Sequence, residues 1–226
     1  MSIVLSRTGR DAEATRFWIG VFRRVIDGAT DVDTDAGWQL MSGISHVATA
    51  ENFDELAGLA AVPRYLPLMP MIYDNFFAKS RNPAISDVVR LLLKPEGLRY
   101  PGSLERAARI AVNRKLVDLI PDIQSLLSST TEDWPDRPSI ARVEDALYRL
   151  RRTRYEQETQ SAGVTALLAD LDGADFQRAA FAANALGSRK ATEALPRLRE
   201  LSRSPDDRLG SEAKAAVKKL EKIHVG

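Results

Sequence analysis

The feature that most constrains the fold is a repeat in the second half of the sequence. Residues 107–121 (AARIAVNRKLVDLIP) align without a gap with residues 182–196 (AANALGSRKATEALP), at an offset of 75 positions. The identical pairs are Ala107/Ala182, Ala108/Ala183, Arg114/Arg189, Lys115/Lys190 and Pro121/Pro196. Similarity at a fixed offset predicts a repeated supersecondary unit.

An offset of this length suits two helical hairpins, so weaker copies are expected between the two aligned segments and after the second one. A small residue recurs at 107, 146, 182 and 216, with spacings of 39, 36 and 34, and four residues later stand Ala111, Leu150, Leu186 and Leu220. Residues i and i+4 share one face of a helix. The pattern predicts hairpins at 102–129, 138–172 and 175–204 and a closing helix at 207–223, which bury that face by stacking. The second helices would turn Ile123, Leu167 and Leu198 inward, and Asp172 and Asp206 would serve as caps or turn residues between hairpins.

The first hundred residues differ in composition and contain ten of the fifteen aromatic residues. Apolar residues at helical spacing predict helices near 10–26, 37–48, 51–61, 70–79 and 84–93, with Pro70 at a first helical position. No run of alternating β-branched residues predicts a strand. The expected fold is all-α: an irregular helical region over 1–100, followed by an α-solenoid over 101–226.

The repeated segments resemble the HEAT-repeat family, in particular its short bacterial HEAT-like form. The best window is 172–223, and with the weaker copies the resemblance extends over residues 102–226. The stretch Phe176-Gln-Arg-Ala179 departs from the Val-Arg that often begins the first helix in that family. The resemblance implies an α-solenoid that binds another macromolecule, and it implies no catalytic residue; the step from fold to function is an analogy.

Composition excludes several classes of function. The chain has 226 residues, no cysteine and two histidines, so disulfides, thiolate metal sites, a cysteine nucleophile and a His-rich metal site are excluded. The 32 basic and 31 acidic residues argue against a general polyanion binder. Apolar stretches are interrupted by proline or charge, so no membrane span is expected. These features favour a cytoplasmic protein without a cofactor.

Candidate binding residues fall in two segments. The first is a basic cluster made of Arg149, Arg151, Arg152, Arg154 and the neighbouring Tyr155, which could bind phosphates or carboxylates. The alternative is a solvated helix face paired with Glu156 and Glu158. Replacing Arg152 by Glu is expected to leave folding intact and to weaken the binding of any acidic partner.

The second segment, 63–77, is rich in proline, methionine and aromatic residues, including Tyr65, Met69 and Tyr73. If exposed, it would supply an apolar anchor for a protein partner. The alternative is that it packs the N-terminal core or caps the first repeat. Among polar groups of the second helices, Asp122, Gln124, Thr165, Arg197 and Glu200 would line the partner surface.

Two weaker signals have ordinary alternatives. The loop 31–37 (DVDTDAG) begins like a calcium loop, but Ala36 and Ser42 replace the turn glycine and the bidentate glutamate, so a solvated acidic loop is favoured. The pairs 114–115 and 189–190 (Arg-Lys) recur at the same place, where they either project from one edge or complement the end of each first helix.

No nucleophile elbow, phosphate loop or zinc-binding helix is present in the sequence. We therefore expect a non-enzymatic protein-binding module, such as an adaptor, scaffold or inhibitor, with another protein as its partner. One alternative is a nucleic-acid-binding HEAT-like protein or a DNA glycosylase-like enzyme. A second alternative is an accessory protein like the HEAT-like bilin lyases, which predicts a deep pocket lined by aromatic residues.

Overall fold

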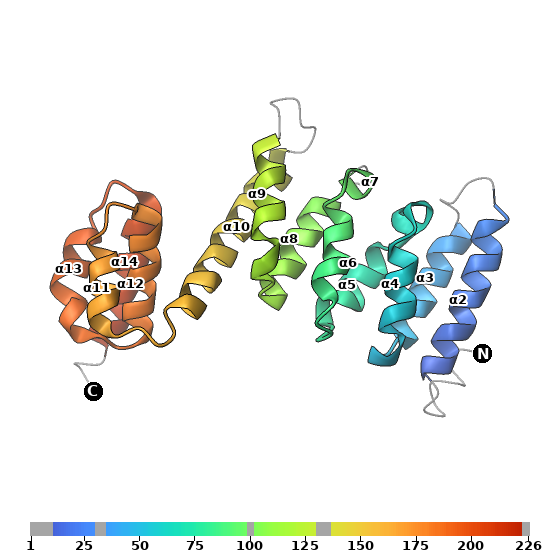
Figure 1. Ribbon diagram of the computed structural model, residues 1–226, viewed down its shortest axis with the longest axis horizontal. Coiled ribbons are helices and arrows are strands. Elements are labelled where there is room, and N and C mark those ends of the chain that lie inside the picture. Colours follow the sequence, from blue (N-terminus) through green and yellow to red (C-terminus); the bar gives the residue numbers. More distant parts are fainter. Residues whose placement is uncertain (1–10, 30–34, 99–101, 130–136, 223–226) are drawn as a thin grey trace. The chain divides into compact units, whose positions relative to one another are not determined.

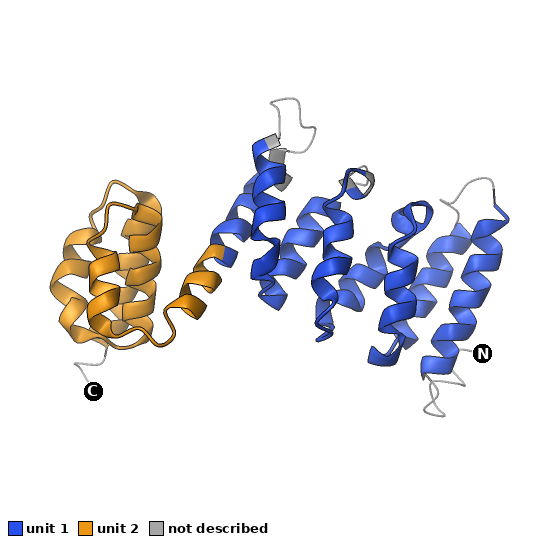
Figure 2. Cartoon of the chain, in the orientation of Figure 1, with its two compact units in different colours: residues 1–150 blue, residues 151–226 orange. Residues whose placement is uncertain are grey.

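Every regular element in the part of the chain that the structure describes is a helix. The computed structural model describes residues 11–29, 35–98, 102–129 and 137–222 (Figure 1). These residues form two compact units, 1–150 and 151–226, which divide within helix α10 (Arg137–Glu158) (Figure 2). The prediction of an all-α protein is confirmed for the described residues.

The first unit opens with two long helices, α2 (Asp11–Asp27) and α3 (Asp35–Val47), which pack against each other. Shorter elements follow: η1 (Ala50–Asn52), α4 (Phe53–Ala60), η2 (Pro63–Leu68), α5 (Pro70–Asn75) and η3 (Phe77–Lys79). Proline has no amide hydrogen and a fixed φ, so Pro63 and Pro70 each stand at the start of their elements, as expected for Pro70.

The rest of the first unit continues the same core. It contains α6 (Ile85–Leu92), α7 (Pro95–Leu98), α8 (Ser103–Arg114), η4 (Val117–Leu119), α9 (Ile120–Ser129) and the first part of α10. One cluster of buried apolar side chains runs from Ile19 to Leu150 and includes Leu92 and Leu104 on either side of residue 100. The compositional change near residues 100–101 therefore does not coincide with a boundary between compact units.

The second unit is built around α12 (Phe176–Ser188). Its other elements are the end of α10, α11 (Val164–Leu171), η5 (Thr192–Ala194), α13 (Leu195–Leu201) and α14 (Asp207–Glu221). Helix α12 packs against both α11 and α14, and α13 packs against α14 (Figure 1). Five consecutive residues of α12, 179–183, are buried, because alanine lets neighbouring helices approach on several sides.

The periodic residues identified in the sequence are all buried. Ala107, Ala146, Ala182 and Ala216 are 0–5% exposed, and the residues four positions later are fully buried. The same holds for Ile123, Leu167 and Leu198, each 0% exposed. The expectation that these positions face the core is confirmed.

The two halves of the repeat also share a backbone conformation. Lys115 and Lys190 have positive φ angles of 57° and 60° at the ends of α8 and α12. In each case the next residue donates its amide hydrogen to the carbonyl five residues earlier, Leu116 to Ala111 at 2.9 Å and Ala191 to Leu186 at 3.1 Å. This left-handed closure satisfies a terminal helix carbonyl. A 3-10 turn and the next helix follow in both places.

The two aspartates expected between hairpins take the two expected roles, one as a cap and one as a turn residue. The Asp206 side chain accepts a hydrogen bond from the Leu209 amide at 2.8 Å and caps α14. The cap of α12 is Asp175, whose carboxylate accepts from the amides of Gln177 and Arg178. Asp172 ends α11 as a turn residue, the other role expected for it, and three residues separate it from the start of α12.

Candidate functional site

The proposed apolar anchor in segment 63–77 is not on the surface. Tyr65, Met69 and Tyr73 are 5%, 0% and 1% exposed and belong to the core of the first unit. The Tyr73 hydroxyl donates to the Val88 carbonyl at 3.2 Å, and the Tyr65 hydroxyl bonds to Asp27. The condition for an exposed anchor is not met, and the alternative, that the segment packs the N-terminal core, is confirmed: the prolines break it into short helices whose apolar side chains turn inward.

Several arginines of the basic cluster are engaged by neighbouring side chains of their own unit. Arg151 donates to Gln177 at 3.2 Å. Arg152 pairs with Glu212 at 3.2 Å and with Glu156 at 3.8 Å. The expected pairing with Glu156 is present for Arg152, but its shorter contact is to Glu212, which the sequence did not indicate. Of the remaining cluster arginines, Arg149 is exposed and Arg154 is half-buried.

Tyr155 is 4% exposed and forms part of a closed network. Its hydroxyl donates to Asp170 at 2.7 Å, and Arg178 donates to both oxygens of the same carboxylate at 2.8 and 3.1 Å. The Arg178 guanidinium also lies 5.2 Å from the centre of the Tyr155 ring, and the Phe181 ring centre lies 5.9 Å from it. Each polar atom of Tyr155 and Asp170 therefore has a partner within the unit.

The pKa shifts in this network agree with its geometry. The hydrogen bond from Arg178 lowers the pKa of Asp170, and Tyr155 acts in the same direction. Burial, followed by the bond to Asp170, raises the pKa of Tyr155. Asp170 is held as an anion and Tyr155 as a neutral hydroxyl, an arrangement that stabilises the packing of α10, α11 and α12. The adjoining hollow has a volume of about 150 Å³, below the about 300–1,000 Å³ typical of ligand pockets.

Some of the polar side chains expected to line the partner surface form ion pairs with neighbouring residues instead. Asp122 accepts from Arg90 at 3.0 Å, and Arg90 also binds Asp87 and Asp118. Arg197 pairs with Asp172 and Glu200, each at 2.7 Å. The hydrogen bond that Arg197 donates to Glu200 is the main reason that the pKa of Arg197 is raised. Gln124 and Thr165 are exposed.

Arg189, of the recurring Arg-Lys pairs, also has a structural role. Its guanidinium donates to the carbonyls of Thr159, Gln160 and Ala162, which follow the end of α10. Lys115 and Lys190, by contrast, are exposed. Because arginine has several donors in a fixed fork, it can satisfy a group of free carbonyls that a lysine would satisfy less completely.

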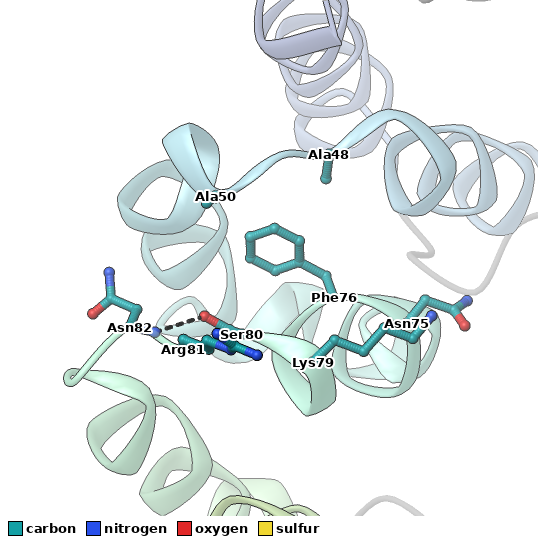
Figure 3. A pocket seen from close by; sticks show the side chains of 8 residues that line it. All are labelled: Ala48, Ala50, Asn75, Phe76, Lys79, Ser80, Arg81 and Asn82. Atoms are coloured by element: carbon teal, nitrogen blue, oxygen red, sulfur yellow. Dashed lines mark hydrogen bonds between the residues drawn. The ribbon is translucent and has the colours of Figure 1, made fainter.

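A larger pocket lies in the first unit, between the end of α3 and the segment that follows α5. Its volume is about 550 Å³. Figure 3 shows the Phe76 ring between Ala48 and Ala50 on one side and the segment Lys79–Arg81 on the other. We call this hollow the Phe76 pocket, and its lining residues are Ala48, Ala50, Asn75, Phe76, Lys79, Ser80, Arg81 and Asn82.

Short hydrogen-bonded turns hold the basic wall of the Phe76 pocket. The Ser80 amide donates to the Phe76 and Phe77 carbonyls, which ends η3. The Ser80 hydroxyl then accepts from the Asn82 amide at 3.1 Å, and the Asn82 side chain accepts from the Ala84 amide at 2.9 Å (Figure 3). Local serine and asparagine bonds of this kind fix a loop without a regular ladder.

The opposite wall is fixed through a buried asparagine. Asn52 is 0% exposed, its side-chain oxygen accepts from the Thr49 amide at 3.2 Å, and its side-chain nitrogen donates to the Ala12 carbonyl of α2 at 3.1 Å. Phe76 is 9% exposed and packs against Phe53 and Phe77. Both walls are therefore anchored in the core, and the pocket is preorganised.

The polar groups around the Phe76 pocket are mostly donors without partners. Within the described residues, the exposed side chains of Lys79 and Arg81 make no hydrogen bond or ion pair, and neither does that of Asn75. No carboxylate lines the hollow. The surface thus presents two cations and an amide beside an apolar floor, which suits an anionic group attached to an apolar body.

Sequence reasoning did not single out Lys79, Arg81 or Asn75. The available signal was the run 75–83 (NFFAKSRNP), in which two aromatic residues precede two cations and a proline. A pattern of this kind also occurs in ordinary surface loops. The missing information was the position of Ala48 and Ala50, far away in sequence, which close the other side.

Other kinds of site receive no support from the described residues. They contain no group of His, Cys, Asp or Glu side chains arranged to hold a metal ion, and residues 31–34 of the calcium-like loop lie outside them. None of the described helices is both long and apolar enough to cross a bilayer.

No family model matches the sequence, and searches of curated proteins and of solved structures also gave no match. The class defined by fold and site is an all-helical protein with a preorganised basic and apolar pocket.

Proposed function

We propose that the chain is a non-enzymatic protein-binding module whose HEAT-like hairpins stack, within each unit, as a stretch of α-solenoid. The observation that carries the proposal is the Phe76 pocket, where unpartnered donors surround an apolar floor. Side chains that donate hydrogen bonds without transferring a proton, as in this pocket, suit the binding of a partner better than catalysis. The acid–base groups elsewhere with shifted pKa values, Asp170 and Tyr155, bind each other.

The hairpin assignment has separate support. Many of the packed pairs join α-helices that are one or two α-helices apart in the chain, as α2 with α3 and α12 with α14. The left-handed lysine closure followed by a 3-10 turn recurs at residues 115 and 190. A stack of similar hairpins exposes a continuous surface that is held by its buried neighbours, and such surfaces are typical binding faces.

The other functions considered from the sequence have weaker support. A nucleic-acid site would need many cations available to phosphates, whereas Arg152, Arg178 and Arg197 are paired with carboxylates and the unpaired Lys79 and Arg81 adjoin an apolar floor. A bilin site would need a pocket lined by several aromatic residues, and Phe76 is the single aromatic residue that lines the Phe76 pocket.

The test is affinity capture with the tagged full chain from a native extract treated with nuclease. A captured protein is then purified separately and titrated into the chain by calorimetry. We expect a binary complex that withstands the nuclease treatment. Loss of all retained material after nuclease treatment, or no heat of binding with the purified candidates, would contradict the proposed function.

A further inference from the structure

The Phe76 pocket has a charge that is not balanced by the residues that line it. Lys79 and Arg81 stand two positions apart, and the turn through Ser80 and Asn82 fixes the backbone between them. Both cations are exposed and lack a carboxylate partner. An anion bound here would form charge-assisted hydrogen bonds without first displacing an existing ion pair.

The apolar part of the pocket determines what must accompany the anion. Ala48, Ala50 and the edge of Phe76 form a floor that a purely ionic ligand would leave wet. A side chain that covers this floor gains free energy from the removal of apolar surface from water. Phe76 is 9% exposed, so Ala48 and Ala50 supply most of the apolar contact, and too little aromatic surface is open for a nucleobase to stack on.

We propose that the Phe76 pocket binds a segment of a protein partner in which an acidic residue stands next to an apolar one. The carboxylate bonds to Lys79 and Arg81, and the Asn75 amide donates to a backbone carbonyl of the segment. The neighbouring apolar side chain lies on Phe76, Ala48 and Ala50. This inference rests on the proposed function and names the chemistry of the partner.

The test is selection from a phage-displayed library of random heptapeptides, with the full chain as bait. Parallel selections use the K79E/R81E variant, which reverses the charge, and the A50W variant, which fills the floor from an exposed position. The matched control is K214E/K218E, the same change of charge at two exposed lysines of α14. Circular dichroism checks the fold of each variant, and K79Q/R81Q replaces the charge reversal if that variant unfolds.

We expect the wild type and the control to enrich peptides with adjacent acidic and apolar residues. K79E/R81E should bind the enriched peptides about tenfold more weakly or worse, because it loses the charge-assisted hydrogen bonds. A50W should show a loss of the same size, because its side chain fills the apolar floor. A library that gives no pocket-dependent enrichment overturns the inference, and so does enrichment of basic peptides.

A labelled single-stranded DNA oligonucleotide serves as the competing probe, and tighter pocket-dependent binding of this probe than of any peptide also overturns the inference. The selection requires no native partner. If a captured protein binds the chain and the pocket variants leave its affinity unchanged, the pocket assignment fails while the proposed function stands.

Discussion

Gly187 of α12 lies directly against Ala216 of α14. A Cβ atom added to Gly187 would lie 2.8 Å from both the Cα and the Cβ of Ala216, closer than carbon atoms in proteins approach. The two helices are therefore in backbone contact, and Ala182, five residues earlier on α12, is also fully buried. Small side chains are required here because they set the distance between the helices.

Replacement of Gly187 by alanine should destabilise the second unit by about 1–3 kcal/mol, because the added methyl group overpacks the crossing. The same replacement at Gly58 in α4, where no atom lies within 4 Å of the added carbon, should stabilise the first unit by up to about 1 kcal/mol through helix propensity. Hydrogen exchange read out by mass spectrometry measures each unit separately. Stabilisation by alanine at both positions would show that α12 and α14 are not in backbone contact.

Replacement of Lys190 by glycine should stabilise the second unit by about 1 kcal/mol, because its positive φ of 60° is costly for residues that carry a Cβ. Lys115, with a φ of 57°, should respond in the same way in the first unit. Both side chains are exposed, so few contacts are lost. Chemical denaturation followed by hydrogen exchange checks both variants. Destabilisation by glycine at both sites would contradict the shared left-handed closure.

Replacement of Arg152 by glutamate should destabilise the second unit by about 1–3 kcal/mol, since it removes charged hydrogen bonds and brings carboxylates together. Arg152 pairs with Glu212, whose side chain is 17% exposed and also accepts from Asn184. The expectation from sequence, that this change leaves folding intact, is thereby revised. Replacement of Lys218, which is exposed on α14, by glutamate is the control. Equal unfolding midpoints for the two variants would mean that the ion pair between Arg152 and Glu212 contributes little to the free energy of unfolding.

The alkaline stability of the second unit should depend on Tyr155, the single tyrosine in residues 151–226. Its pKa is raised in the folded chain, so the stability it contributes is present below its unfolded pKa of about 10 and is lost as the pH rises through the folded value. Replacement by phenylalanine should cost about 1–2 kcal/mol at neutral pH. The difference from wild type should shrink as the pH rises above about 10. A difference independent of pH would exclude the bond to Asp170 as its cause.

The helices and the buried periodic positions could be predicted from the sequence, because the alternation of small and large apolar residues has a helical period and a fixed repeat. The position of Asp175 as a cap, three residues beyond Asp172, could not, and for Tyr65 and Tyr73 the sequence left burial and exposure both open. Burial of an aromatic segment depends on which distant helices pack on it, and composition alone does not show this. The Phe76 pocket joins residues near 50 with residues near 80, so local patterns could not reveal it.

The close crossing of helices at small side chains is the physical basis of the proposed hairpin stack. Its most direct test is hydrogen exchange across α12 in the Ala182→Glu variant, with Ser188→Glu as the control on the exposed end of the same helix. An unpaired charge at a fully buried site should cost several kcal/mol, roughly 3–5, and remove the protection of α11, α12 and α14 together. Protection equal to that of the wild type in Ala182→Glu would contradict the crossing and the hairpin assignment built on it.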